Sequence, residues 1–240
     1  PLPVSLNLTA TYVKKTKTYT LKGVDADNTT GAVNDMNTFI GSSNIGDGAT
    51  GCGPVWEAMN FAAMRQFRTL WPADRRGGLP VIFFFVNNFY AMGGQTLDET
   101  MSFERLARIG AAFNADNLHA ETIDGNDPLA VADAIRRKRE VIEAGQGPAL
   151  IDCQCYRQVG HSTSDAGSYR TAEEIDAWRA IDPIVEFGDR LEGAGVLARI
   201  EREALGRWAL ERVRQTCALA VDLRISPRPE PRADRLRCGG

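Results

Sequence analysis

Hydrophobic and polar positions fall into alternating blocks along most of the chain. Continuous apolar runs are typical of buried strands, and apolar residues that recur every three or four positions are typical of helices. The clearest strand is Val81–Val86, an uninterrupted apolar run between Pro80 and Asn87, which predicts a central strand covered on both faces. Further strands are predicted at residues 38–45, 119–123 and 148–156.

The predicted helices lie between these strands. Gly53-Pro54 opens the first, since proline is favoured where a helix begins. Its apolar face is expected to carry Val55, Met59, Ala63, Phe67 and Leu70. A second helix is predicted over Leu97–Phe113, and a third from Asp127-Pro128 to just before Gly145. Alternating strands and helices predict an α/β fold with a mostly parallel, doubly wound sheet.

The flanks of this pattern set the expected domain organisation. Residues 1–36 lack the periodicity of a core helix, although the Thr-rich part has some strand propensity. One domain is predicted over 37–224, including later helices from Asp182-Pro183 and over 200–223. The end of the chain, 225–240, is rich in Pro and Arg and is predicted to be a disordered tail.

Composition excludes several classes of protein. A net charge of −3 gives no support for nucleic-acid binding, and no apolar run approaches the length of a membrane span. The N-terminus lacks the apolar core of a signal peptide. Five cysteines without ligand spacing argue against a disulfide framework or a zinc site. Cys153 and Cys155 alternate on a predicted strand, which indicates buried thiols on one face and a reducing compartment.

The candidate chemistry lies where predicted strands end. Gly46-Asp47-Gly48 follows the first of these strands, and Asn87-Asn88 follows Val81–Val86. Ligands of such sheets bind beyond the carboxyl ends of the strands, so these residues are expected to converge. Carboxylate and amide oxygens suit Mg²⁺, and backbone N–H groups of the helix expected after Gly48 suit a phosphate. The sequence therefore predicts a site for Mg²⁺ and a diphosphate.

A third segment narrows this prediction. The run Tyr156–Asp165 is followed by Ser168–Thr171, and both come after Asn87–Gly93 in the order expected. Together with Gly46-Asp47-Gly48, these motifs resemble the α-type half of thiamine-diphosphate-dependent 2-oxo acid dehydrogenase E1 components, the family of pyruvate, branched-chain and acetoin dehydrogenases. The resemblance covers about residues 44–222.

The resemblance implies a role for each matching residue. Side-chain oxygens of Asp47 and Asn88 and the main-chain carbonyl of Tyr90 would bind Mg²⁺. The Gly46–Ala49 turn would hold the diphosphate, with the N–H groups of Gly48 and Ala49 as donors. Arg157 would bind a terminal phosphate oxygen through its planar guanidinium group.

His161 is the catalytic residue that the resemblance implies. It would lie beside the cofactor and contact phosphate, substrate or intermediates, and its charge can change near neutral pH. Thiamine diphosphate would supply the carbanion that attacks a 2-oxo acid, from which CO₂ leaves. The acyl group would pass to the lipoyl domain of an E2 protein.

The resemblance also implies partners and a location. A β-type subunit or domain would complete a hetero-oligomer and supply the glutamate that activates the cofactor, so the chain is expected to be inactive alone. The location would be the bacterial cytoplasm, or the mitochondrial matrix in a eukaryote.

The sequence departs from the family pattern in places. The interval between Asp47 and Asn88 is longer than in most members, which indicates an insertion around Leu70–Pro80 and resembles forms with fused α- and β-type halves. Val159 stands where many members have the first histidine of His-Gly-His. Residues 1–43 do not resemble the family's preceding segment. The resemblance therefore implies a thiamine-diphosphate-binding fold that is incomplete at the N-terminus, in a truncated or rearranged product or a fragment.

Other interpretations remain open. Asp47 alone could be a helix cap, Arg157 could make a surface ion pair, and His161 could be an ordinary loop residue. Tyr169-Arg170 is expected to anchor the loop rather than touch substrate. The whole chain could be a non-catalytic assembly or binding module that keeps the fold. A Mg²⁺-dependent nucleotide-binding domain is a weaker interpretation, because the glycine-rich motifs of such domains are missing from the sequence.

Overall fold

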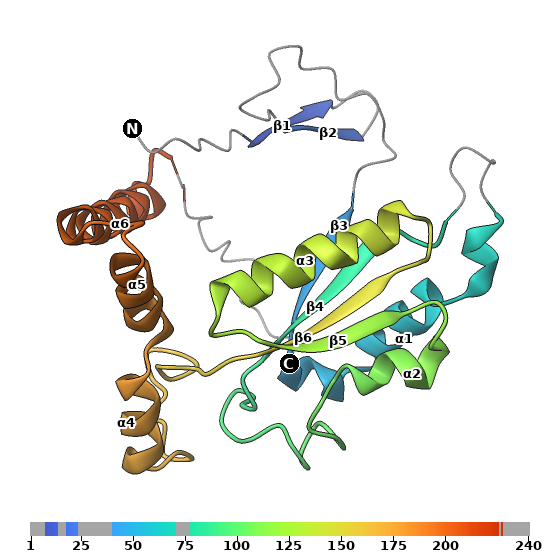
Figure 1. The fold of residues 1–240 in the computed structure, drawn as a ribbon, viewed down its shortest axis with the longest axis horizontal. Coiled ribbons are helices and arrows are strands. Elements are labelled where there is room, and N and C mark those ends of the chain that lie inside the picture. Colours follow the sequence, from blue (N-terminus) through green and yellow to red (C-terminus); the bar gives the residue numbers. More distant parts are fainter. Residues whose placement is uncertain (1–7, 14–17, 24–39, 71–76, 226, 228–240) are drawn as a thin grey trace, which may run out of the picture. The chain divides into compact units, whose positions relative to one another are not determined.

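A four-stranded parallel sheet forms the centre of the fold (Figure 1). The computed structural model describes residues 8–13, 18–23, 40–70, 77–225 and 227. The strands are β3 (Gly41–Gly46), β4 (Val81–Asn87), β5 (His119–Asp124) and β6 (Ala149–Gln154), in the spatial order β3-β4-β6-β5. The predicted α/β fold with a parallel sheet is therefore confirmed.

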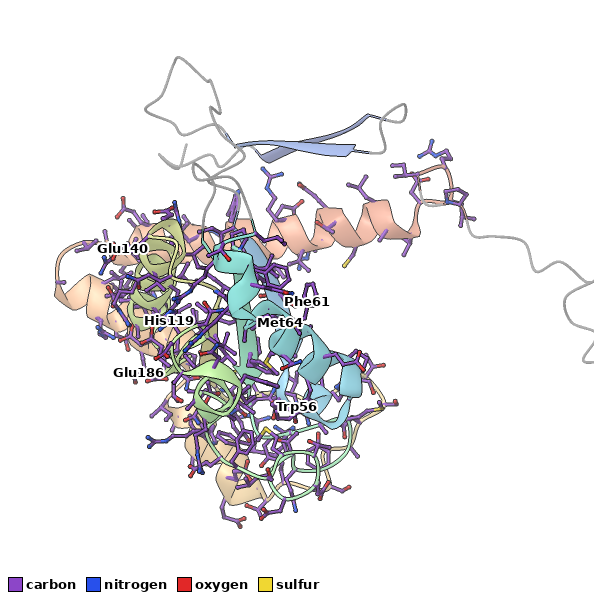
Figure 2. The ribbon with its side chains drawn as sticks, turned by 90° about the vertical axis from the view of Figure 1, so that its right-hand side faces the viewer. Trp56, Phe61, Met64, His119, Glu140 and Glu186 are labelled. Carbon is purple, nitrogen blue, oxygen red and sulfur yellow. The ribbon has the colours of Figure 1, made fainter. Side chains whose placement is uncertain are left out.

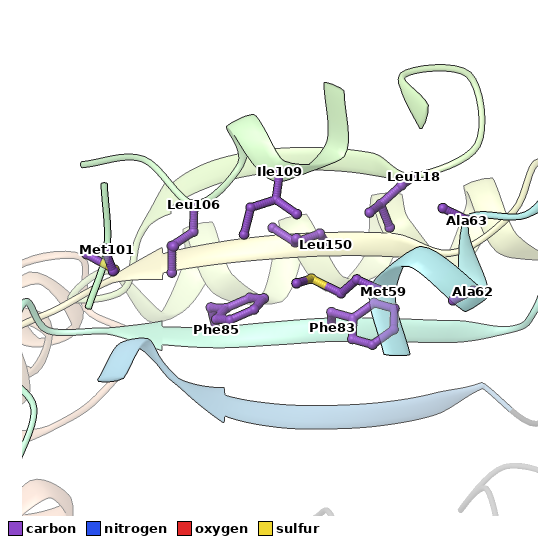
Figure 3. Packing of buried hydrophobic residues seen from close by; sticks show 10 residues of the cluster. All are labelled: Met59, Ala62, Ala63, Phe83, Phe85, Met101, Leu106, Ile109, Leu118 and Leu150. Carbon is purple, nitrogen blue, oxygen red and sulfur yellow. The ribbon is translucent and has the colours of Figure 1, made fainter. Parts of the chain in front are cut away.

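Helices cover both faces of this sheet. One face packs against α1 (Gly53–Ala62) and α2 (Arg108–Asn114), and the opposite face packs against α3 (Pro128–Glu143) (Figure 1). The larger core lies on the α1 and α2 side, where Phe83 and Phe85 meet residues of both helices (Figure 3). Strand β4 is thus covered on both faces as predicted, except at Val86, whose exposed fraction is 38%.

The second predicted helix is wrong over its first half. The helix was expected over Leu97–Phe113, but α2 begins at Arg108, and the residues before it form turns and a short bridge between Leu97 and Met101. Asp98 has a φ of 67°, which a right-handed helix does not allow. The amide of Leu106 donates to the Asp152 carboxylate, 2.9 Å away on β6, instead of to a helical carbonyl. Tertiary hydrogen bonds therefore replace the helical ones.

The first helix is also shorter than its apolar pattern. After α1 the chain forms a 3₁₀ turn, η3 (Arg65–Arg68), because Met64 is extended with a ψ of 126°. Phe67 on this turn is buried, but Leu70 is 61% exposed and lies outside the core. The apolar face predicted for one helix is therefore divided between a helix and a turn.

The remaining described elements are a two-stranded hairpin and a group of three helices. Strands β1 (Leu8–Val13) and β2 (Thr18–Gly23) form an antiparallel hairpin. Residues from Ala172 onward form a second compact unit with α4 (Ala172–Ala180), α5 (Pro183–Gly193) and α6 (Arg199–Val221).

A guanidinium group on α6 links this helix to α5. Arg202 on α6 donates to Asp189 at 2.6 Å and to Glu192 at 3.0 Å, both on α5. The boundaries at 36 and 224 stay predictions, and the predicted tail at 228–240 lies outside the described residues. No helix in the described part of the chain has the length and apolar character needed to cross a membrane.

Candidate functional site

All four parallel strands end at the same edge of the sheet. Asp47 follows β3, Asn88 follows β4, Gly125 follows β5 and Cys155 follows β6. Parallel strands bring their carboxyl ends together, which is where ligands of such folds bind. The structure therefore places two of the predicted metal ligands, Asp47 and Asn88, at one edge.

Asp47 is buried directly after β3, with 2% of its surface exposed. Its Oδ2 accepts a hydrogen bond of 2.6 Å from the hydroxyl of Thr96. Burial raises the pKa of Asp47, while the Thr96 hydroxyl and the backbone amides of Gly48 and Asn88 lower it. Burial therefore removes part of the hydration that stabilises the charged form, and a cation beside this carboxyl group would favour that form.

Asn88 and its neighbour Asn87 are fixed in different ways. The Oδ1 of Asn88 accepts the amide of Tyr90 at 3.0 Å, as in an Asx turn. Asn87 is fully buried, and its Nδ2 donates to Asp152 Oδ1 at 3.0 Å. Asn87 therefore holds the strand end, while Asn88 shapes the turn beside Asp47.

Asp152 is a buried acceptor shared by three segments. Besides Asn87 on β4, its carboxylate accepts from the Leu106 amide and from the Thr122 hydroxyl on β5, each at 2.9 Å. None of its surface is exposed. This one side chain ties two strand ends and the segment before α2 to β6.

Two arginines and three tyrosines form a cluster beside this edge. The guanidinium carbons of Arg157 and Arg170 lie 5.5 and 5.6 Å from the centre of the Tyr90 ring. Arg157 Nη1 donates to the Ala91 carbonyl at 2.8 Å, and its Nη2 donates to the Tyr169 hydroxyl. Among the described residues Arg157 therefore contacts aromatic rings, a carbonyl and a hydroxyl group, and no ion pair of its guanidinium group is found.

Each arginine of this cluster has one unsatisfied donor. The Nε atoms of Arg157 and Arg170 are buried and have no hydrogen-bond partner among the described residues. Buried donors without a partner are rare in native structures and call for an explanation. An anion is the natural partner for such a pair of guanidinium groups.

The loop that carries His161 is organised by Asp165. This carboxylate accepts the His161 amide at 2.7 Å, the Gly167 amide at 2.8 Å and the Tyr169 hydroxyl at 2.7 Å. The Tyr169 hydroxyl, followed by these amides, lowers the pKa of Asp165 to about 2. Tyr169 therefore anchors the loop, as expected.

The imidazole of His161 is exposed, in contrast to this ordered backbone. No hydrogen bond joins it to Asp47 or Asn88 within the described part of the chain. Hydrogen bonds thus link Asp47, Asn88 and Tyr90, whereas none joins His161 to them among the described residues.

The turn after Asp47 lies between β3 and the first helix. It is a 3₁₀ segment, η2 (Asp47–Gly51), and α1 begins only at Gly53. Trp56 lies on α1, where Figure 2 labels it. It fixes this turn, because its Nε1 donates to the Thr50 carbonyl at 2.7 Å. The predicted helix start at Gly53-Pro54 is therefore confirmed, whereas Gly48 lies in the 3₁₀ segment before this helix. The roles of Gly46, Gly48 and Ala49 toward a diphosphate stay predictions.

The groups at this edge of the sheet that could bind a metal are oxygen atoms. No group of three or more His, Cys, Asp or Glu side chains that could hold a metal occurs among the residues with described positions. One carboxylate with amide and carbonyl oxygens resembles the sites that Mg²⁺ occupies together with water and phosphate oxygens. The residues present therefore fit a Mg²⁺-diphosphate group, with the two unsatisfied guanidinium donors available for an anion.

Comparison with known proteins gives the family. Residues 24–227 match the family described as "Dehydrogenase E1 component", which is most of the chain. The chain belongs to the dehydrogenase E1 component family. The motifs at Asp47, Asn88 and Arg157 all fall inside the matched range.

Individual relatives of this E1 chain are α subunits. It is 39% identical over 159 residues to the pyruvate dehydrogenase E1 component subunit alpha type II of Ascaris suum, covering 65% of this chain and 36% of the relative. A testis-specific human pyruvate dehydrogenase E1 α subunit is 33% identical over 80% of this chain and 44% of its own length. The 2-oxoisovalerate dehydrogenase subunit alpha of Bacillus subtilis is 32% identical over 68% of this chain and 44% of its length. The chain thus spans well under half of these relatives.

Sequence patterns missed several residues of the site in this E1 chain. Thr96 lies 49 positions from Asp47, and Asp152 lies 46 positions from Leu106. The only available signal was an acidic residue inside the apolar run of β6, which indicates a buried, hydrogen-bonded carboxylate.

Proposed function

We propose that this chain is an E1 α-type domain that binds Mg²⁺-thiamine diphosphate at an interface with a β-type partner. The observation that carries the proposal is the buried Asp47 carboxylate beside the Asn88 turn, in a chain of the E1 family. Asp47, Asn88 and the Tyr90 carbonyl hold the metal. Arg157, with its unsatisfied Nε, binds a phosphate oxygen.

The residues of the chain have defined tasks in this proposal. Thr96 orients the Asp47 carboxylate, and the Asp165 network keeps Arg157 and the His161 loop in place. His161 contacts substrate and exchanges protons from the open side of the site. When bound, thiamine diphosphate supplies the carbon nucleophile for decarboxylation of a 2-oxo acid. The acyl group then passes to a lipoyl group on an E2 protein.

The names of the relatives support this assignment at the level of the reaction class. They include the α subunits of both pyruvate and 2-oxoisovalerate dehydrogenases, so a 2-oxo acid is the proposed substrate. The bacterial cytoplasm or the mitochondrial matrix is the proposed location, since relatives come from bacteria and from mitochondria.

Calorimetry of the chain with a β-type partner tests the metal assignment. Thiamine diphosphate is titrated with and without Mg²⁺ into wild type, Asp47→Asn and the control Asp116→Asn. Asp116 is an exposed carboxylate paired with Arg65, so its replacement should leave the affinity unchanged. Asp47→Asn should weaken Mg²⁺-dependent binding at least about tenfold, as loss of a metal-site residue commonly does.

Two outcomes separate the competing functions. Equal Mg²⁺-dependent affinity in wild type and Asp47→Asn would refute the metal assignment. Tight binding without conversion of any 2-oxo acid by the complex would instead favour the non-catalytic module considered from the sequence.

A further inference from the structure

Strand β3 has one side that no described strand covers. The spatial order β3-β4-β6-β5 makes β3 and β5 the two outer strands of the parallel sheet (Figure 1). β3 pairs with β4 over its whole length, and among the described residues no strand pairs with its other side. An outer strand presents a row of unpaired N–H and C=O groups, which a further strand can bind.

The hydrogen bonds to β4 decide which backbone groups of β3 face outward. The amide of Gly41 donates to the Pro80 carbonyl at 2.8 Å, so the backbone groups of Gly41 face β4. Because successive residues of a strand direct these groups to opposite sides, those of Ser42, Asn44 and Gly46 face away from β4. The burial pattern agrees, since these three residues are exposed and the residues between them are half-buried.

The residues of β3 leave room for a neighbouring strand. A methyl group added at Gly46 would have no described atom within 4 Å, and one added at Gly41 would meet only the Pro80 carbonyl, at 3.8 Å. Between these glycines, the Ser42 hydroxyl contacts the Asn44 amide oxygen at 3.4 Å, and both side chains are small. Both ends of the strand are therefore uncrowded.

The two outer strands of the sheet differ in charge. β5 carries Glu121 and Asp124, whereas β3 has the sequence GSSNIG, with no charged residue and no proline. The pairing of β3 with β4 is also continuous, without a bulge. Natural proteins protect exposed outer strands with charges, prolines or bulges. β3 has none of these protections, which indicates that its outer side pairs with another strand.

The outward residues of β3 are arranged symmetrically about Asn44. In an antiparallel pair, two residues that lie opposite each other can exchange both of their backbone hydrogen bonds. When Asn44 lies opposite Asn44 of a second copy, Ser42 of each copy lies opposite Gly46 of the other. One two-fold axis therefore satisfies all the outward N–H and C=O groups of both strands, and no like charges meet. This self-complementarity favours a second copy over an unrelated strand.

We infer that two copies of this chain associate by antiparallel pairing of their β3 strands about Asn44, which joins the two parallel sheets into one continuous sheet. One pair of outer strands is a small interface, so we expect a dissociation constant of about 10–100 µM. The pairing uses backbone groups of β3 and needs neither Mg²⁺ nor thiamine diphosphate. It therefore stands if the proposed function is refuted.

Sedimentation velocity of the full chain tests this inference. Wild type should change from monomer to dimer between about 1 and 200 µM, a range that brackets the expected dissociation constant. Asn44→Pro removes an N–H group that faces outward and keeps the hydrogen bonds to β4, so it should weaken association at least about tenfold. The matched control Asn44→Ala keeps this N–H group and should associate as wild type does.

Charged variants test the register of the pairing. Asn44→Lys and Asn44→Glu each place like charges directly opposite one another, so each variant alone should associate at least about threefold more weakly than wild type. A mixture of the two variants places opposite charges there and should associate more tightly than either variant alone. Recovery in the mixture also shows that both variants are folded.

Three results would overturn the inference. One is a wild-type chain that stays monomeric throughout, as expected if a segment of the same chain occupies the outer side of β3. The others are a dimer that persists in Asn44→Pro and a mixture of charged variants without recovery, since the contact would then lie elsewhere. If circular dichroism shows that Asn44→Pro is unfolded, the mixture decides the question.

Discussion

Replacing Asp152 by Ala should strongly destabilise the chain. The change removes one acceptor that serves three donors, namely the Asn87 amide group, the Leu106 amide and the Thr122 hydroxyl. Each buried donor left without a partner costs about 1–3 kcal/mol. Partial relaxation reduces the total, so we expect a loss of about 3–5 kcal/mol in the free energy of unfolding.

Urea denaturation followed by tryptophan fluorescence measures this loss, and thermal denaturation gives an independent value. In a chain of this size each kcal/mol shifts Tm by about 2–4 °C, so Asp152→Ala should lower Tm by about 6–20 °C. The matched control is Thr122→Val, which removes one donor and leaves the other two satisfied. It should cost only about 1 kcal/mol.

The double variant Asp152→Ala/Thr122→Val tests whether the shared acceptor causes the loss of stability. Without the Asp152 carboxylate, the Thr122 hydroxyl has lost its acceptor, so Thr122→Val should be near neutral or favourable in that background. Two costs that simply add, or a smaller cost for Asp152→Ala than for Thr122→Val, would refute the shared-acceptor account.

Three further predictions follow from the same geometry. Because burial raises the pKa of Asp47, folding favours the neutral form of this carboxyl group. Its contribution to stability is present below the ordinary pKa of 3.8 and is lost as the pH rises through the pKa that Asp47 has in the folded chain. Asp47→Asn should therefore raise Tm of the metal-free chain at pH 7, with the gain vanishing below pH 4 in a pH series of thermal melts. The pKa of Asp165 is shifted the other way, down to about 2, so its contribution to the order of the loop is present above pH 3.8 and falls as the pH drops toward 2. Hydrogen exchange of residues 156–170 should become faster over that range. Asp165→Asn should exchange faster already at neutral pH. Gly125→Ala forces its new methyl group to within 2.6 Å of a sulfur atom and should cost about 1–3 kcal/mol in urea denaturation, whereas Gly93→Ala, with open space around it, should change stability by less than about 0.5 kcal/mol.

The pattern of apolar residues correctly predicted the strands and helices that are stabilised mainly by burial of one continuous apolar run or face. The apolar run of β4 and the strand before Asp127 were read correctly, as was the Asp127-Pro128 start of α3, where the Asp127 side chain caps the Leu129 amide at 2.9 Å. The segment before α2 was misread, because its apolar residues recur at helical spacing while its amides bond to β6 and to turns. Periodicity reports which side chains are buried and not where the amides find acceptors.

The sequence by itself determined the family and the order of its motifs, because Asp47, the Asn87-Asn88 pair and the Tyr156–Asp165 loop each lie in short runs of adjacent residues. It also determined the parallel α/β fold, since that follows from alternating periodicities along the chain. Only the tertiary structure decided which side chains share one environment.

The Thr96 bond to Asp47 and the three donors on Asp152 join residues from separate segments of the chain. The closeness of Gly125 to Cys153 Sγ and Cys155 Cβ likewise depends on β5 pairing with β6. Such contacts are fixed by the order and register of the strands, and a one-residue shift in register would turn every side chain to the opposite face.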